Sequence, residues 1–326
     1  MNPRAPVLVA LSFLLASPIG ACATADPGAA PGRVHPSLLK AGASSDSAAP
    51  RDASSLSSQP NATSSAASVA VSPPPLDSVA ADVAAPCPPE MAFVTARHAG
   101  FCVDRFEAQL VEVFSDGTRR PHAPSERPLA DHDYVATSRA GVFPQAFVSR
   151  VDSARACDRA GKRLCSRAEW QAACRKDGRA VYPYGNTHVD GLCNTGKAHL
   201  LLRLFPDYAY HWDYEAHFNA AALALEPGFL ARTGQYESCA SELGVHDMVG
   251  NLHEWVSDGV TRAFLESFAA EGRRQWQPAT PGNGMFMGGF FSTSNEHGAG
   301  CNFTTVAHDA AYHDYSTGFR CCAATR

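Results

Sequence analysis

The sequence lacks an excess of charge of either sign. It has 27 Lys and Arg residues against 32 Asp and Glu residues, which gives a formal net charge of −5 and a pI near 6.2. Because this balance provides no basic field, we predict that nucleic acid is not a partner. The chain also lacks a Ser-His-Asp order, a phosphate-binding glycine loop, an HExxH motif and any internal repeat. These absences argue against the common hydrolase, nucleotide-binding and zinc-protease patterns.

A hydrophobic run long enough to span a bilayer is also missing from the N-terminus. The apolar run over 5–16 follows the basic Arg4 and is too short for a stable transmembrane helix. The segment ends in IGAC (19–22), which resembles a bacterial lipobox. We therefore expect 1–22 to be a lipoprotein signal peptide, with Cys22 as the lipidated first residue of the mature protein. Ordinary secretion with cleavage nearby and a retained anchor are the alternatives.

Aromatic residues are absent from 23–86, where Ala, Ser and Pro dominate. Such a segment cannot bury enough apolar surface to offset its ordering entropy, so we expect a disordered tether. As a flexible coil it would span on the order of 40–50 Å and hold a folded domain clear of a membrane. The chain as a whole is 45% hydrophobic, which suffices for a core, and we expect 87–326 to fold as one domain.

Cysteine, in contrast, is abundant. The chain has 11 Cys residues, which favours an oxidising compartment and a disulfide framework. Setting Cys22 aside leaves ten (11 − 1), an even number, but the count alone does not fix the pairing. Together with the N-terminal pattern, this composition predicts a membrane-anchored lipoprotein of the bacterial cell envelope, facing the periplasm or the cell surface.

Two patterns give clear local predictions. Residues 101–114 alternate apolar and polar side chains, which predicts a strand, and Asp116-Gly117 predicts a hairpin turn after it. Ser166-Arg167-Ala168-Glu169 is a capping-box pattern, so a helix is expected from there to Gly178.

Weaker patterns complete the local picture. A helix is predicted over 152–160, with Gly161 as its C-cap, and a turn over 182–185. Helical pieces are expected over 216–225. Elsewhere Gly and Asn punctuate the chain, which predicts long irregular loops held by disulfides or bound ions.

One stretch, GVHDMVGNLHEWVSDG over 244–259, concentrates unusual residues. It is too polar for an ordinary core strand and too rich in glycine for a helix. Gly250-Asn251 is a turn pair, because both residues tolerate positive φ. Trp255 brings a large apolar body whose indole N–H requires a partner. The stretch predicts either a hydrogen-bonded loop around a tryptophan or a hairpin that contains a buried tryptophan.

Six motifs occur in order along the chain: FCVDRFEA (101–108), GKRLCSRAEWQAACR (161–175), YPYGN (182–186), GVHDMVGNLHEW (244–255), MGGFF (287–291) and GFRCC (318–322). Their combination resembles the formylglycine-generating-enzyme family, also called the sulfatase-modifying-factor domain. The resemblance covers 87–326. It implies an irregular, loop-rich α+β single domain that is related to the C-type-lectin fold and stabilised by disulfides.

Active members of that family oxidise a sulfatase cysteine to formylglycine with oxygen and a copper(I) ion held by two thiolates. A soft copper(I) ion requires soft sulfur ligands. The resemblance places the two cysteines on Thr293 and on or near Gly298, and Phe290 stands where the family has a serine. Because neither position is a cysteine, we expect no bound copper and no catalytic residue of this type.

The resemblance also implies disulfides. A cysteine of the second helix pairs in the family with one that follows the catalytic loop, and a cysteine before GKRL pairs with that of GFRC. Carried over, these are Cys174–Cys301 and Cys157–Cys321, and the others are expected as Cys165–Cys322, Cys87–Cys102 and Cys193–Cys239. A disulfide is thus the favoured role of Cys301, and a catalytic one is the alternative.

Two kinds of metal site are possible. His297, Cys301, His308 and His313 surround the former catalytic loop and could form a copper, zinc or iron site, with Cys301 and His308 as the weak catalytic candidates. Their spacing matches no common metal motif, and histidines on a surface loop are the alternative. Members of the family often hold Ca²⁺ on loop oxygens. The resemblance places one calcium ion at Asn194 and Thr195 and a second near 242–244, and ordering of these turns by hydrogen bonds alone is the alternative.

The remaining polar motif residues are assigned to architecture. The resemblance implies that they pin loops together, although a catalytic carboxylate constellation is the other interpretation; they are Asp247, Gly250, Asn251, Glu254 and Trp255. Asp104 and Glu107 are given the same structural role.

Two functions remain from different classes. The first is a lipid-anchored envelope protein that has lost the cysteine oxidation and acts as a binding or scaffold module for an unknown protein or glycan. The alternative is a divergent oxygen-dependent metal oxidoreductase of the same family, acting on a protein or a small molecule. The sequence favours the first, because neither a soft-ligand site nor a facial-triad metal site is visible.

Overall fold

The computed structural model describes residues 85–96, 99–175, 178–209, 211–271, 279–293 and 297–326. Every described residue lies in one compact unit. The predicted signal peptide with Cys22, and all but the last two residues of the predicted tether, lie outside the described residues. Within these residues, we find no helix with the length and apolar character to cross a membrane.

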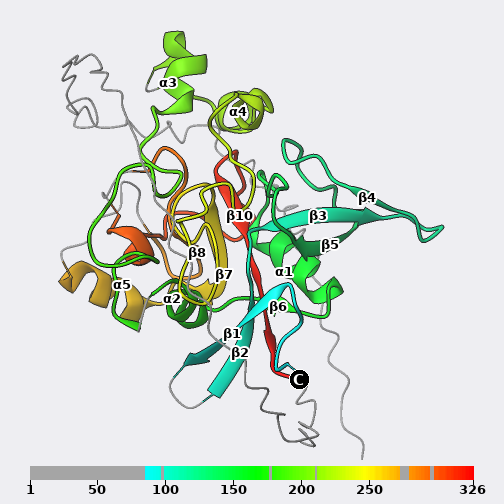
Figure 1. The fold of residues 1–326 in the computed structure, drawn as a ribbon. Helices are drawn as coiled ribbons and strands as arrows, with labels where there is room; N and C mark the ends of the chain where they lie inside the picture. Colours follow the sequence, from blue (N-terminus) through cyan, green and yellow to red (C-terminus); the bar gives the residue numbers. More distant parts are fainter. Residues whose placement is uncertain (1–84, 97–98, 176–177, 210, 272–278, 294–296) are drawn as a thin grey trace, which may run out of the picture. The chain divides into compact units, whose positions relative to one another are not determined.

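The described residues form three small sheets (Figure 1). The first is antiparallel, in the order β1 (Met91–Ala96), β2 (Ala99–Asp104), β11 (Cys321–Ala324) and β6 (Arg163–Leu164). The second has the order β10 (Thr317–Phe319), β7 (His253–Gly259), β8 (Gly284–Met287) and β9 (Thr304–Thr305). The third has the order β4 (Arg119–Pro121), β3 (Ala108–Val113) and β5 (Asp133–Ser138). Segments far apart in sequence are therefore neighbours in each of the first two sheets.

The helices are short and lie between these strands in sequence. They are α1 (Arg150–Arg159), α2 (Arg167–Cys174), α3 (Leu200–Leu204), α4 (Ala222–Leu225) and α5 (Arg262–Ala270), with 3-10 turns at Pro206–Tyr208 and Gly300–Asn302 and a π-helix at Tyr214–Phe218. In Figure 1, α1 lies beside β5, and α3 and α4 lie together above the β10–β7–β8 sheet.

The predicted helices over 152–160 and from Ser166 are both confirmed, with different ends, and the C-cap of the first is Ala160 where Gly161 was predicted. Helix α1 begins two residues before the predicted start, because the Ser149 side chain caps it by accepting from Asp152 N. Helix α2 has the predicted capping box between Ser166 and Glu169. It ends at Cys174, however, because Arg175 is already extended (φ −87°, ψ 125°), so the predicted end at Gly178 is wrong.

The prediction of one strand over 101–114 is also wrong. The segment forms β2 and β3, which belong to different sheets. Between them Arg105 N donates to Glu90 O at 3.1 Å, and Phe106 N donates to the Ser138 hydroxyl at 3.1 Å. These bonds turn the backbone out of the first sheet between β2 and β3. The alternation of apolar and polar side chains continues across this turn, so the sequence pattern does not show where β2 ends.

The predicted turns are confirmed. Gly117 N donates to Phe114 O at 2.9 Å and closes the hairpin between β3 and β4. In the turn over 182–185, Tyr182 N donates to Gly185 O at 2.8 Å. The helical pieces expected over 216–225 exist as a π-helix at Tyr214–Phe218 and as α4.

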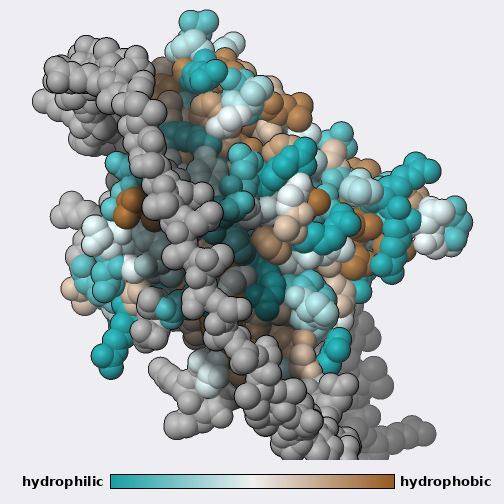
Figure 2. All heavy atoms as spheres, viewed as in Figure 1, coloured by the Kyte–Doolittle hydropathy of each residue, from teal (hydrophilic) through white to brown (hydrophobic). Residues whose placement is uncertain are grey.

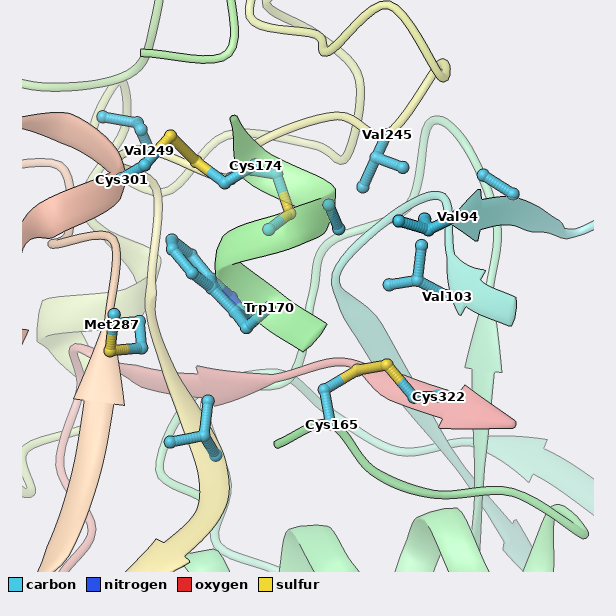
Figure 3. Close-up of a cluster of buried hydrophobic side chains, with 14 of the residues drawn as sticks. Val94, Val103, Cys165, Trp170, Cys174, Val245, Val249, Met287, Cys301 and Cys322 are labelled. Atoms are coloured by element: carbon cyan, nitrogen blue, oxygen red, sulfur yellow. A yellow bond between two sulfur atoms is a disulfide. The ribbon is translucent and has the colours of Figure 1, made fainter. Parts of the chain in front are cut away.

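The main core is built around Trp170 of α2. Figure 3 shows its indole between two disulfides, Cys174–Cys301 on one side and Cys165–Cys322 on the other. Met287 of β8 and valines of the first sheet complete this cluster. On the surface, hydrophobic side chains are interspersed with hydrophilic ones on the face that Figure 2 shows.

Candidate functional site

The stretch over 244–259 joins the elements of the domain, and its turn is confirmed. Gly250 and Asn251 both have positive φ, 82° and 57°. A Cβ atom at Gly250 would lie 2.2 Å from Asn194 O, so only glycine fits there. Asn251 N donates to the same Asn194 O at 3.0 Å, which fixes the turn against the 193–196 loop.

The Asn251 side chain connects three segments. Its Nδ2 donates to Glu107 Oε2 at 2.5 Å, and its Oδ1 accepts from Ala231 N at 2.9 Å and from Asn194 Nδ2 at 2.8 Å. Glu107 also accepts from Leu252 N at 3.1 Å. All of these groups are buried, so the bonds replace water that folding removes. Asn251 therefore acts as an internal clamp, as the architectural interpretation predicts.

The expectation that this stretch is too polar for a core strand is wrong, since its second half forms β7. Glu254 is 1% exposed and is neutralised by Arg320, whose Nε and Nη2 donate to its two oxygens, each at 2.6 Å. Trp170 Nε1 donates to Glu254 Oε2 at 2.8 Å. A bidentate charge pair with a third donor satisfies the carboxylate and allows it to be buried.

Trp255 on the same strand finds the partner that its indole requires. Its Nε1 donates to Val148 O at 2.9 Å, and its ring meets Phe286 edge to face with centroids 4.8 Å apart. Both interactions position β7 against β8 and the start of α1. The tryptophan is thus a core residue with a satisfied polar end.

The buried carboxylates near Arg320 have perturbed proton affinities. Burial raises the pKa of Glu107 well above its usual value, and the charges of Asp247 and Glu254 raise it further. Burial also raises the pKa of Asp247 to about 6, although Gly234 N donates to its carboxylate at 2.6 Å. Three carboxylates around one guanidinium thus form a closed structural network.

Asp104 is held in the same structural way. Its Oδ1 accepts from Lys162 Nζ at 2.6 Å, and its Oδ2 accepts from Cys321 N at 3.2 Å. Burial raises the pKa of Asp104, and Lys162 opposes that rise. The carboxylate at the end of β2 thus joins that strand to the segment between α1 and β6 and to β11.

In the loop that the resemblance aligns with the family's catalytic loop, the first expected cysteine position is Thr293. Thr293 Oγ1 accepts from Phe290 N at 2.7 Å, so the threonine closes a tight turn after Gly288-Gly289. Thr293 O accepts from Gly196 N at 3.2 Å, and Phe291 O accepts from Lys197 N at 2.9 Å. Residues 294–296 lie outside the described part, and Gly298 comes two positions after them. The loop is thus bonded to the 193–197 segment through its backbone.

All ten cysteines among the described residues are in disulfides. The structure forms the five pairs that the resemblance led us to expect, Cys87–Cys102, Cys157–Cys321, Cys165–Cys322, Cys174–Cys301 and Cys193–Cys239. Cys301, the cysteine nearest to the loop, is 0% exposed and linked to Cys174. It therefore provides no thiolate.

The histidines near the loop pack against aromatic rings. His308 stacks on Tyr312 with centroids 3.7 Å apart, and burial lowers the pKa of His308 to about 4. His297 meets Phe303 edge to face, and His313 Nδ1 lies 2.8 Å from Asn219 Oδ1. In the part of the chain that the structure describes, no three His, Cys, Asp or Glu side chains are arranged to hold a metal ion.

The sequence did not single out His253, which lies at the centre of this group. It is 7% exposed, and its ring centroid lies 4.5 Å from that of Phe286 and 5.0 Å from that of Phe290. Burial lowers the pKa of His253 well below its usual value, and His297 and His308 lower it further. The sequence feature that could have identified His253 is its position in the GVHDMVGNLHEW motif over 244–255.

At the first expected calcium site, Asn194 Oδ1 is buried and has no partner among the described residues, while Asn194 Nδ2 donates to Phe229 O at 2.8 Å. The Lys197 ammonium donates to Gly228 O at 2.6 Å and to Phe229 O at 3.0 Å. Thr195 follows Asn194 in a tight turn, where its N–H donates to Cys193 O at 2.9 Å.

At the second expected calcium site, a cationic side chain binds the backbone oxygens. Arg105 Nη1 donates to Leu243 O at 2.9 Å and to Gly244 O at 3.3 Å. Calcium binds six to eight oxygens at roughly 2.3–2.6 Å, often with carboxylates. Arg105 thus occupies two backbone oxygens of the second expected site, and Lys197 occupies the backbone oxygens of Gly228 and Phe229 beside the first.

Comparison with known proteins agrees with the motifs. A family model described as "Sulfatase-modifying factor enzyme 1-like domain" matches residues 95–325. No curated protein sequence matches the chain.

Solved structures give remote similarities. "Major Tropism Determinant P3c Variant" is similar over 73% of this chain and 53% of its own, at 17% identity and a TM-score of 0.34. "Crystal Structure of CarF" is similar over 72% of this chain and 95% of its own, at 13% identity and a TM-score of 0.37. The chain thus spans about half the length of the Major Tropism Determinant chain.

The six ordered motifs, the loop-rich α+β fold with its disulfides and the match of the family model agree with one another. The fold is of the formylglycine-generating-enzyme type, which is related to the C-type-lectin fold. The chain belongs to the sulfatase-modifying-factor domain family.

Proposed function

We propose that this protein is a lipid-anchored cell-envelope protein whose sulfatase-modifying-factor domain does not oxidise cysteine to formylglycine and acts as a binding or scaffold module. One observation carries the proposal. Where the family resemblance places a pair of copper-binding thiolates, this chain has Thr293 and Gly298, and the nearest cysteine, Cys301, is in a buried disulfide. Copper(I) prefers sulfur ligands, and none is available at this loop.

The packing of the loop supports the same proposal. Ser292 Oγ donates to Ala198 O at 3.0 Å, and the Phe291 ring meets Phe229 with centroids 5.6 Å apart. These contacts use the side chains of the loop to hold the segment that follows residue 196. A loop with this bonding serves the architecture of the domain.

The proposed anchor is the lipid on Cys22, followed by a tether over 23–86. The ten described cysteines pair with one another in five disulfides, so none of them is left over as a partner for Cys22. Disulfides persist in oxidising compartments, which is consistent with the envelope. The module would then present its surface to a protein or glycan at a distance from the membrane.

The first experiment tests for the family's reaction. The full chain is incubated with a CxPxR peptide, copper, a reductant and oxygen, and the peptide is analysed by mass spectrometry. We expect no conversion of cysteine to formylglycine. Conversion would overturn the proposal, and oxygen consumption that depends on added copper or iron would favour the oxidoreductase alternative.

The second experiment tests the anchor. We expect Cys22→Ser to move the protein from the membrane fraction to the soluble envelope fraction, because a serine cannot take up the thioether-linked lipid. Unchanged fractionation would contradict lipidation at Cys22. Cys87→Ser is a suitable comparison, since it removes a disulfide cysteine and leaves the signal intact.

A further inference from the structure

Lys197 lies where three segments of the domain meet. Its ammonium donates to the backbone oxygens of Gly228 and Phe229 at 2.6 and 3.0 Å, and its own N–H donates to Phe291 O at 2.9 Å. The ammonium also faces the rings of Phe229 and Tyr236, with centroids at 6.0 and 5.8 Å. Burial lowers the pKa of Lys197. The carbonyl oxygens and ring faces around the Lys197 ammonium are the kinds of group that surround a bound cation.

Arg105 repeats this arrangement at a second crossing of loops. Its guanidinium donates to Leu243 O at 2.9 Å and Gly244 O at 3.3 Å, and its Nε donates to Pro89 O at 3.3 Å. The contacts join the segment before β1 to the loop before β7. A Cβ atom at Gly244 would lie 2.8 Å from Nη1, so the loop backbone approaches the guanidinium closely.

We propose that Lys197 and Arg105 are built-in cations that stabilise converging backbone oxygens, beside Asn194 and within 242–244, where the family resemblance implies two calcium ions, so that the domain folds without a divalent metal. Converging backbone oxygens carry partial negative charge, and a cation stabilises them. A covalently attached ammonium or guanidinium supplies this charge with directed N–H donors. It therefore needs fewer oxygen ligands than calcium, and it cannot be removed by a chelator.

Both sites lack the carboxylate ligands that are common in calcium sites. Five backbone oxygens are engaged in total, two by Lys197 and three by Arg105, and no carboxylate takes part in these bonds. Asn194 reinforces the first site by donating its Nδ2 to the Phe229 oxygen that also accepts from Lys197. An oxygen that already accepts two hydrogen bonds has no lone pair left for a metal.

The experiment measures thermal unfolding of the purified full chain, with disulfides intact, in excess EGTA and in millimolar CaCl₂. We expect the same Tm in both buffers for the wild type and no stoichiometric calcium after dialysis. We expect Lys197→Met to lower the Tm in EGTA by roughly 2–6 °C, because two charge-assisted hydrogen bonds are lost. The matched control is Arg119→Met, which removes an exposed charge on β4 and is expected to leave the Tm unchanged.

Three results would overturn the proposal. They are a wild-type Tm that EGTA lowers or CaCl₂ raises, calcium that remains bound in stoichiometric amount, and a Lys197→Met variant with the Tm of the control. The calcium measurements need no variant, so the proposal stays open to refutation if Lys197→Met fails to fold. None of these readouts depends on the peptide assay, so the two proposals can fail independently.

Discussion

Replacing Arg320 with methionine is the most direct test of how the domain holds its buried carboxylates. Arg320 is 0% exposed and makes four hydrogen bonds: two to Glu254, one to Asp104 O at 3.0 Å and one to His246 O at 2.9 Å. Methionine keeps much of the apolar volume and removes the charge. The variant leaves Glu254 buried without its cationic partner, with Glu107 and Asp247 nearby.

The expected cost follows from the geometry. Removing one member of a buried ion pair typically lowers the free energy of unfolding by about 3–5 kcal/mol, because the other charge remains desolvated. For a domain of this size, each kcal/mol corresponds to about 2–4 °C in Tm, so the Tm should fall by roughly 6–20 °C. Burial alone would lower the pKa of Arg320, but the charge of Glu254 and its hydrogen bonds raise it. Arg320 therefore stays charged in the wild type and keeps its ion pair with Glu254.

The assay is guanidinium chloride unfolding with disulfides intact, followed by tryptophan fluorescence, since Trp170 and Trp255 are fully buried beside this network. The control is Arg159→Met, which breaks the ion pair between Arg159 and the half-exposed Asp133. Exposed pairs contribute about 0–1 kcal/mol, so the control should change little.

A double variant separates lost charge from lost packing. Adding Glu254→Gln to Arg320→Met removes the unpaired carboxylate, and we expect it to restore part of the lost free energy of unfolding. If Arg320→Met costs less than about 1 kcal/mol, the pair does not stabilise the core as argued. An unchanged loss in the double variant would show that the cost comes from packing alone.

Two further predictions concern pH and disulfides. The pKa of Asp247 is raised from 3.8 to about 6, so its protonation stabilises the fold below pH 4, and this contribution, about 3 kcal/mol, is lost as pH rises through 6. We expect Asp247→Asn to remove this part of the fall in stability between pH 4 and 7, whereas the exposed Asp131→Asn leaves the profile unchanged; identical profiles for Asp247→Asn and the wild type would contradict the assignment. Replacing both Cys174 and Cys301 by alanine opens a crosslink with a sequence separation of 127, and should lower the free energy of unfolding by about 2–5 kcal/mol, measured by denaturant titration. A loss below about 1 kcal/mol would show that other contacts hold the loop after residue 293 in place.

Features that depend on neighbours in sequence were predictable. The capping box at Ser166 and Glu169 uses groups three residues apart, and the Gly250-Asn251 turn depends on the backbone freedom of the two residues themselves. The ordered motifs also led to the family, because they are spaced along most of the domain.

Features that depend on distant partners were not predictable. The strand β7 contains Glu254, and nothing in the local sequence shows that Arg320, 66 residues later, neutralises it. The break between β2 and β3 depends in the same way on Ser138. Nothing in the local sequence distinguishes Lys197 and Arg105 from other basic residues. Their roles follow only from the backbone oxygens that the fold places next to them.

The strand β11 has a consequence for the order of events during biosynthesis. It lies between β2 and β6, so the first sheet has a gap until residues 321–324 have been synthesised. Cys321 and Cys322 then close crosslinks that reach back 164 and 157 residues. Contacts of such separation form slowly. The β4–β3–β5 sheet, whose strands lie within 108–138, can therefore form before the first sheet is complete.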